Sequence, residues 1–359
     1  MLDEAYDKSK EVIRVCSTKK GLFASGGIKG YRGVWARDSM ISLIGASLAG
    51  DEFKEIFKKS LVTLEENQSN HGQIPNAVIG RKADYKSIDS SLWFIIGEYI
   101  YRKRYKDNSL FNSHKKAIEK ALTWLEYQDM GEDSMLEQLP TSDWQDAFPH
   151  RYGHTINTQA LYYEVLNLAG KRRKARKLRK RVNKNEDDKL WGNEYYYSYR
   201  WKNHNKYKEI GDWFDSLGNL LAIIFGVADR KQASKILNYI EKKKINKPYP
   251  MKAIYPPINR ESKHWQDYYI DCAAGNPNSY LNGGIWTFIG GFYVLALVKM
   301  GKFREAEQEL KKLAECNLRG NFPEWIHPIT KRNYGELQAW SAGMYIAAYK
   351  SLKMGKVLI

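Results

Sequence analysis

The sequence predicts an all-α protein, an (α/α)6 barrel of six helical hairpins in one catalytic domain that spans residues 1–359. Long helical periodicity dominates the chain, and strand signals are scarce. The helical segments are either amphipathic and Lys-rich or apolar on nearly every side, and the two kinds alternate strictly. Six polar-faced helices around six buried ones give each kind the surroundings that it requires.

The expected outer helices carry one apolar and one charged face. They lie at residues 3–17, 51–66, 110–128, 171–184, 229–243 and 302–317. The expected inner helices lie at residues 37–49, 89–101, 156–169, 215–228, 283–299 and 336–352. Successive inner helices are far enough apart for one hairpin plus loops. A helical solenoid is the competing arrangement, and we favour the closed barrel because the unusual residues cluster at one end of the inner helices.

Polar and aromatic residues precede or open each inner helix. They include Trp35, Arg37, Asp38, Asp89, Trp144, Asp146, Asp215, Asn282, Trp286, Glu324 and Trp340. If the inner helices run parallel, these residues meet at one mouth, where the helix N-termini favour acidic side chains and polar ligands. Any one of the aspartates could simply complement a helix N-terminus. Similar segments at all six positions favour a common site.

Two acidic residues among aromatics form the central motif of the chain. Asp146 lies in PTSDWQDAF and Glu324 in NFPEWIHP, ahead of the third and the sixth inner helix. In a ring of six, these positions are opposite. Two carboxyls across a sugar-sized pocket are the minimum for glycosidic cleavage, and a separation of ~6.5–9.5 Å suits inversion. Asp143 and Glu336 are reserve candidates, and a structural role for either residue of the pair is the alternative.

The net charge of +17 is concentrated in residues 171–184, which hold ten basic residues and no acidic one. Such a tract fits either a nucleic-acid contact or a solvated helix on the outside of the fold. It shows no interleaving of basic and aromatic residues, and no nucleic-acid motif occurs elsewhere. We therefore expect the solvated helix, with nucleic acid left open.

Cysteine usage and the N-terminus predict a cytoplasmic protein. Cys16, Cys272 and Cys316 form no Cys-x-x-Cys pair, which argues against a disulfide framework and a zinc site. The first residues are charged and contain no apolar signal segment. Residues 281–298 are uncharged, but they contain an asparagine and four glycines, so we expect a buried helix and no membrane span.

The other chemical motifs are weak. His150 and His154 have the i, i+4 spacing of metal ligands, but a glycine between them disfavours a helix. The Gly-rich stretch at 23–33 lacks the Lys-Ser/Thr ending of a phosphate loop, and we expect it to line the mouth. We expect neither a metal nor a cofactor. The oligomeric state stays open.

Five segments, in order along the chain, resemble one family. WARDSMISL and SIDSSLWFI resemble signatures of the amylo-α-1,6-glucosidase domain of glycogen debranching enzymes, as does SDWQDAF followed by GHTINTQALYYEVL. YLNGGIWTFIGG resembles a segment that these domains share with neutral and alkaline invertases. FPEWIHPITKRNYGELQAWSAG is similar to their closing segment and to that of processing α-glucosidases. The resemblance covers about residues 30–350 and indicates the six-hairpin glycosidase superfamily.

The resemblance implies an inverting hydrolase that needs no cofactor. By position, Asp146 matches the general acid of the family and Glu324 its general base. The positions that it implies for sugar binding are Arg37, Asp38, Asp89, Trp35, Trp286 and Trp340. Trp144 and Asn282 are further candidates, because their segments lead into inner helices at the expected mouth. Leu281 replaces a His of the invertase pattern and Gln145 replaces a Met, which leaves the identity of the sugar open.

The sequence therefore predicts an inverting glycoside hydrolase that acts on an α-glucoside or a small oligosaccharide. A small substrate is expected because the large N-terminal domains of debranching enzymes are absent from the sequence. A non-catalytic sugar-binding module and a phosphorolytic glycosyl transferase are the alternatives on the same fold. The sugar, the linkage and the anomer stay open.

Overall fold

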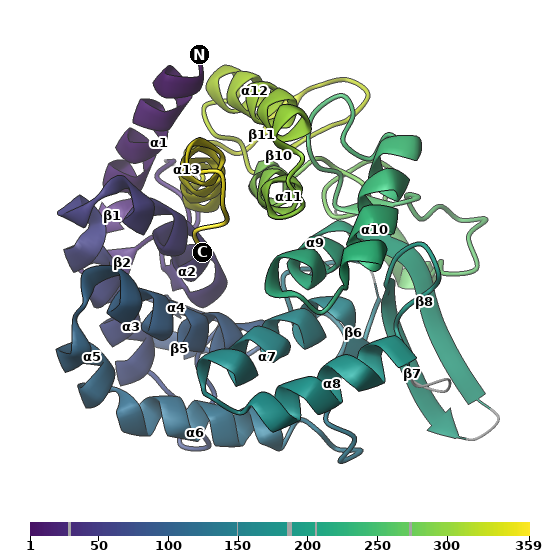
Figure 1. Ribbon diagram of the computed structural model, residues 1–359, viewed down its shortest axis with the longest axis horizontal. Helices are drawn as coiled ribbons and strands as arrows, with labels where there is room; N and C mark the ends of the chain where they lie inside the picture. Colours follow the sequence, from purple (N-terminus) through teal and green to yellow (C-terminus); the bar gives the residue numbers. More distant parts are fainter. Residues whose placement is uncertain (28–29, 149, 185–188, 205–206, 273–274) are drawn as a thin grey trace.

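A computed structural model describes residues 1–27, 30–148, 150–184, 189–204, 207–272 and 275–359 (Figure 1). Six helices form an inner set: α2 (Ala36–Ala46), α4 (Asp89–Tyr105), α7 (Ile156–Leu168), α9 (Ser216–Phe225), α11 (Thr287–Lys299) and α13 (Ala339–Lys353). The outer helices are α1 (Leu2–Cys16), α3 (Lys54–Glu66), α5 (Asn108–Ser113), α6 (Lys115–Glu126), α8 (Arg172–Lys184), α10 (Arg230–Lys242) and α12 (Phe303–Arg319). The chain is thus mostly helical, as expected.

The inner helices contact one another in sequence order around a ring. Each packs on the next, and α13 packs back on α2 (Figure 1). Every residue of α2 is buried, as the all-round apolar character of these segments predicts. The contact between α13 and α2 requires glycine, because a Cβ on Gly45 would lie 1.9 Å from the carbonyl oxygen of Gly343.

Three predicted helices have different limits. The segment 110–128 is divided into α5 and α6, which meet at His114. The inner helices expected from 283 and 336 begin at Thr287 and Ala339. Ahead of Thr287 the chain is extended, because Ile285 pairs with both Lys252 and Ile326 in isolated bridges.

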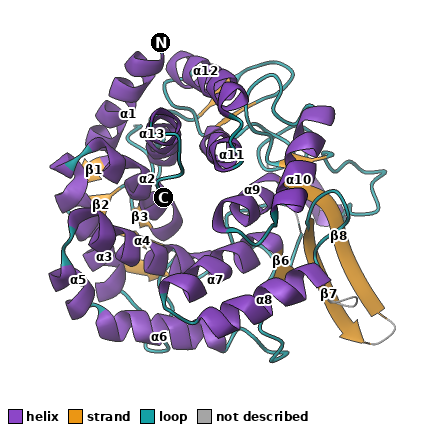
Figure 2. Ribbon diagram, in the orientation of Figure 1, coloured by secondary structure: helices purple, strands orange, loops and turns teal. Residues whose placement is uncertain are grey.

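The expectation of scarce strands is wrong for one region (Figure 2). An antiparallel sheet in the order β6 (His154–Thr155), β7 (Tyr197–His204), β8 (Tyr207–Asp215) and β9 (Ile254–Tyr255) lies beside α8 and α10. Three smaller sheets join β1 (Ser17–Thr18) to β2 (Gly21–Leu22), β3 (Val34–Trp35) to β4 (Ala77–Ile79) and β5 (Lys82–Asp84), and β10 (Trp325–Ile326) to β11 (Asn333–Tyr334).

The basic tract forms α8 on the outside of the ring, packed on α7 (Figure 1). Its apolar residues Ala175, Leu178 and Val182 are buried, whereas Arg172 and Arg176 are exposed. This position fits the solvated-helix interpretation, and a nucleic-acid contact stays a prediction.

Residues 287–298 are buried inside the ring as part of α11. In the part of the chain that the structure describes, every helix is too short or too polar to cross a bilayer.

Candidate active site

A buried arginine at the start of α2 binds a carboxylate at the start of α4. Arg37, in the first turn of α2, is 4% exposed. Its Nη1 donates to both carboxylate oxygens of Asp89, at 3.1 Å each. Its Nη2 lies 3.7 Å from Oδ2 of Asp146, and its Nε lies 4.0 Å from Oδ2 of Asp38. The guanidinium of Arg37 thus lies within 4.0 Å of three carboxyls, which come from three chain segments.

The two innermost carboxyls of this cluster have shifted pKa values. Burial raises the pKa of Asp89, and the charge of Arg37 opposes that rise. Burial also raises the pKa of Asp38 to about 6, again opposed by Arg37 and reinforced by the charge of Asp146. Both shifts follow from the cost of keeping a carboxylate charged away from water.

Asp146 is the carboxyl of the Arg37 cluster that a ligand can reach. Its side chain is 45% exposed, whereas that of Asp89 is fully buried. Crowding by the surrounding protein raises the pKa of Asp146, the charge of Arg37 lowers it, and the charge of Asp89 raises it. The residue therefore combines access from solvent with an increased tendency to hold a proton.

Glu324, the second predicted catalytic carboxyl, directly precedes β10. Its backbone N–H donates to the carbonyl of Tyr334 at 2.9 Å, which fixes the start of β10. Its Oε1 accepts a hydrogen bond from Tyr31 at 3.1 Å. Burial raises the pKa of Glu324 to about 7, opposed by the hydrogen bond from Tyr31 and reinforced by the charges of Asp38 and Asp146. Glu324 therefore interacts electrostatically with two carboxyls of the Arg37 cluster.

Two tyrosines that sequence reasoning missed complete this part of the site. Tyr31 lies at the end of the Gly-rich stretch that was expected to line the mouth, with its ring 5.8 Å from that of Trp35. Burial raises the pKa of Tyr280, and the charges of Glu324 and Asp146 raise it further. The only sequence signal for either residue was its closeness to a predicted site segment.

The reserve carboxyls have other environments. Asp143 is fully buried in an ion pair with Arg151, which also pairs with Asp215. Asp143 also accepts hydrogen bonds from the backbone of Gln145 at 3.0 Å and the amide of Asn157 at 3.3 Å. This carboxylate is sealed by the protein, so a role as the general acid does not fit.

Glu336, the second reserve candidate, is exposed. It accepts a hydrogen bond from the amide of Asn321 at 3.2 Å. Its carboxyl is thus more open to solvent than that of Glu324.

The predicted tryptophans differ in access. Trp144 and Trp286 are buried and meet edge to face, with ring centroids 5.8 Å apart. Trp340 is also buried and stacks on Phe288 at 4.1 Å. Trp286 also meets Trp340 edge to face at 5.6 Å and so joins the three rings into one buried group, whereas Trp35 is partly exposed. Direct stacking on a sugar therefore fits Trp35 better than the other three.

Asn282 has a structural role instead of the expected substrate contact. Its side-chain oxygen accepts from the backbone N–H of Ile258 at 2.7 Å, and its amide donates to the carbonyl of Ile258 at 2.8 Å. The side chain is fully buried. Both of its polar atoms are thus used to hold two loops together.

Several buried polar side-chain atoms near these residues have no hydrogen-bond partner among the described residues. They are Nε1 of Trp35, Trp144 and Trp340, Nε of Arg37, both amide atoms of Gln145, and Oε1 of Gln338. Buried polar groups are normally hydrogen-bonded. These side chains therefore depart from that rule around the Arg37 cluster.

Among the described residues, no group of three or more His, Cys, Asp or Glu side chains is placed to hold a metal ion. In the Arg37 cluster, the guanidinium is the cation that the carboxyls surround.

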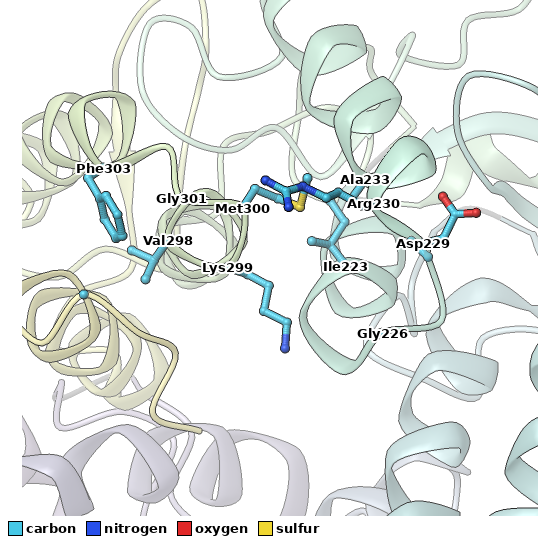
Figure 3. A pocket seen from close by; sticks show the side chains of 12 residues that line it. Ile223, Gly226, Asp229, Arg230, Ala233, Val298, Lys299, Met300, Gly301 and Phe303 are labelled. Carbon is cyan, nitrogen blue, oxygen red and sulfur yellow. The ribbon is translucent and has the colours of Figure 1, made fainter.

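A pocket of about 480 Å³ lies away from these residues (Figure 3). Ile223 and Val298, near the C-terminal ends of α9 and α11, line it together with Arg230 and Phe303 at the starts of α10 and α12. No predicted site residue lines this pocket. It therefore lies at the opposite end of the inner helices from the carboxyl pair.

Comparison with known proteins identifies one family over nearly the whole chain. The family described as amylo-alpha-1,6-glucosidase matches residues 8–347. Neutral/alkaline invertase 1, mitochondrial, from Oryza sativa subsp. japonica is 37% identical over 144 residues, which are 39% of this chain and 22% of that protein. Probable alkaline/neutral invertase A, chloroplastic, from Arabidopsis thaliana is 24% identical over 361 residues, which cover 83% of this chain and 56% of that protein.

The chain spans less than two thirds of either invertase. The relatives are named for mitochondria and chloroplasts, and one as a cytosolic invertase, so a cytoplasmic location stays a prediction.

Solved structures show a similar fold. The GH63 mannosylglycerate hydrolase from Thermus thermophilus, in complex with Tris and D-glycerate, has a TM-score of 0.73 at 13% identity, over 95% of this chain and 99% of that one. A rhamnosidase from Klebsiella oxytoca with rhamnose bound has a TM-score of 0.68 at 14% identity, over 99% of this chain and 64% of that one. Since the family match covers nearly the whole sequence, the chain belongs to the amylo-alpha-1,6-glucosidase family, within the six-hairpin glycosidase superfamily.

Proposed function

We propose that this chain is a glycoside hydrolase on an (α/α)6 barrel, which cleaves an α-glucoside or a small oligosaccharide with inversion. The observation that carries the proposal is the pair Asp146 and Glu324. They lie 178 positions apart in sequence, yet the charge of Asp146 contributes to the raised pKa of Glu324. The closed ring of inner helices supports the barrel over an open solenoid.

The proposed reaction needs one proton donor and one proton acceptor on opposite faces of the sugar. Asp146 gives its proton to the glycosidic oxygen as the bond to the anomeric carbon breaks. Glu324 takes a proton from a water molecule, whose oxygen attacks the anomeric carbon from the other face. The products are a sugar of inverted configuration and a free alcohol. Solvent then returns Asp146 to its protonated state and Glu324 to its ionised state.

The proton affinities of the two carboxyls support proton transfer at this site. Desolvation by the surrounding protein raises the pKa of both Asp146 and Glu324, so each holds a proton more readily than a free carboxyl. Arg37 lowers the pKa of Asp146, whereas that of Glu324 reaches about 7. The order of roles therefore rests on the family resemblance, in which Asp146 matches the acid. A glycosyl fluoride tests it, because fluoride leaves without protonation, so the acid variant keeps more activity on this substrate than the base variant.

The surrounding residues provide the means to hold a sugar. Asp38 and Arg37 present charged hydrogen-bonding groups beside Asp146, and Asp89 keeps the guanidinium fixed. Trp35 offers a partly exposed ring for a sugar face. We propose a direct contact for Asp38 and Trp35, and support of the pocket floor for Trp144, Trp286 and Trp340.

The test is a panel of glycosides offered to the purified protein. It contains α-glucosides, sucrose and mannosylglycerate, because relatives of this chain carry the names of enzymes for different sugars. Release of sugar by the wild type and its loss in Asp146→Asn is the expected result. Binding without release across the panel, or release that requires inorganic phosphate, contradicts the hydrolase.

A further inference from the structure

A groove with a volume of about 560 Å³ lies beside the loops that lead into α4 and α7. Four aromatic side chains from separate segments line it: Tyr85 from the loop before α4, Trp124 from α6, Tyr152 from the loop before β6, and Trp201 from β7. The rings of Tyr152 and Trp201 are 5.4 Å apart. The volume falls in the range of about 300–1,000 Å³ that small-molecule sites occupy.

The walls of this groove are the segments that carry site residues. Residues 85–88 run directly into Asp89, and residues 137–142 run into the segment that ends at Asp146. A backbone hydrogen bond of 2.8 Å from Ile88 to Ser142 joins the two walls. Two segments that line the groove therefore continue along the chain into Asp89 and Asp146, two carboxyls of the Arg37 cluster.

The chemistry of the lining favours a neutral ligand rich in hydroxyls. Lys86 and Glu137 are the lining residues with a formal charge at neutral pH, and their charges cancel. The carboxylate of Glu137 already accepts a hydrogen bond of 2.6 Å from the backbone of Met130. Aromatic faces together with the amides of Gln73 and Gln128 suit a sugar, whose C–H face stacks while its hydroxyls hydrogen-bond.

We propose that this groove binds the outer sugar units of a neutral oligosaccharide whose terminal unit lies between Asp146 and Glu324. The proposal rests on the function proposed above and extends it, because it makes a chain of several sugar units the preferred substrate over a single glucoside. A protein partner is the alternative occupant of the groove, because two apolar side chains that line it, Met130 and Leu139, are 84% and 76% exposed.

The test compares Trp124→Ala and Tyr85→Ala with the wild type on oligosaccharides of two to seven units. Tyr127→Ala is the matched control, because Tyr127 follows α6, is 77% exposed and does not line the groove. We expect each groove variant to lower kcat/KM and binding affinity for the longer chains by about 10-fold, the loss of one ring contact, with the disaccharide unchanged. Thermal unfolding of each variant establishes that it is folded.

Binding measured by calorimetry separates the two proposals. Oligosaccharides that bind the wild type through Trp124 and Tyr85 without being hydrolysed uphold the groove and contradict the hydrolase. If the groove variants and the control have the same kcat/KM for hydrolysis at every chain length, the groove proposal is contradicted. The hydrolase proposal is then unaffected. Self-association of the wild type that Trp124→Ala abolishes, without any effect on sugars, also overturns the groove proposal in favour of a protein partner.

Discussion

Two buried arginines near the helix N-termini each lie among carboxylates, and they differ in what those carboxylates can do. Arg151 is sealed between Asp143 and Asp215, and all three side chains are fully buried. Arg37 pairs with the buried Asp89 but lies next to Asp146, which is open to solvent. A closed cluster holds segments together, whereas an open one leaves a carboxyl with an altered pKa where a ligand can reach it.

The comparison matters because Asp143 and Asp146 are three positions apart in one segment. Both are aspartates that follow a turn and flank Trp144. Only their partners distinguish a structural carboxylate from a candidate catalytic one.

The largest expected effect is on turnover in the open cluster. Asp146→Asn removes the proposed proton donor, and Glu324→Gln the proposed acceptor, so kcat falls by about 10²–10⁴ in either variant. Sugar binding changes little in either variant, and the melting temperature of Asp146→Asn stays close to that of the wild type. Steady-state kinetics with calorimetry measures both. Turnover within a factor of two of the wild type in both variants would remove the catalytic assignment.

The closed cluster is expected to respond in stability instead. Asp143→Asn deprives the buried Arg151 of one of its two carboxylates, which costs about 3 kcal/mol in the free energy of unfolding. Denaturant unfolding measures this, with Asp146→Asn as the matched control three residues away. An Asp143→Asn protein as stable as the control would show that the sealed ion pair has no structural importance.

The raised pKa of Glu324 predicts a pH-dependent cost to stability. A carboxyl whose pKa is higher in the folded state, here about 7 against an ordinary 4.5, stabilises the fold below its unfolded pKa, and this stabilisation is lost as pH rises through 7. Glu324→Gln removes the ionisation, so its melting temperature should exceed that of the wild type at pH 8. The difference should disappear at about pH 4.

Melting curves at the two pH values test this directly, with the exposed Glu336→Gln as control. Equal melting temperatures of wild type and Glu324→Gln at pH 8 would mean that Glu324 ionises at no cost.

The smallest expected effect belongs to Tyr31, which donates to Glu324. Tyr31→Phe removes a hydrogen bond that lowers the pKa of Glu324, so that pKa rises further. The acidic limb of the kcat/KM profile should move upward by about 0.5–1 pH unit, as expected for one net hydrogen bond. Tyr127→Phe, on the outer face, should leave the profile in place. A drop in kcat with no shift of the limb would assign Tyr31 to substrate contact.

Helical periodicity predicted most of the fold because buried and half-buried helices differ in pattern. The β7–β8 hairpin was missed although Tyr197, Tyr199 and Trp201 alternate with the polar residues Ser198 and Arg200, a period-two signal. Helices and loops can be equally rich in aromatic residues, so composition alone did not distinguish the strand. The late start of α11 depends on bridges from Ile285 to distant segments, which local sequence does not encode.

For the site, the resemblance and the motifs brought together Arg37, Asp38, Asp89 and Asp146, which the structure places in one cluster. The role of Asn282 could not be predicted, because its use depends on Ile258, a residue in a separate loop. The burial of Trp144 and Trp286 likewise arises from packing across the ring. The sequence identified residues near the site. Whether each one can contact a substrate or only supports the fold depends on its neighbours in space, which the sequence does not show.

The anomeric configuration of the first product tests the central claim most directly. Proton NMR during hydrolysis of an α-linked substrate records the sugar anomer before mutarotation equilibrates it. Water activated by Glu324, on the face opposite Asp146, predicts that the β-anomer appears first. The α-anomer as the first product would contradict an inverting pair at Asp146 and Glu324.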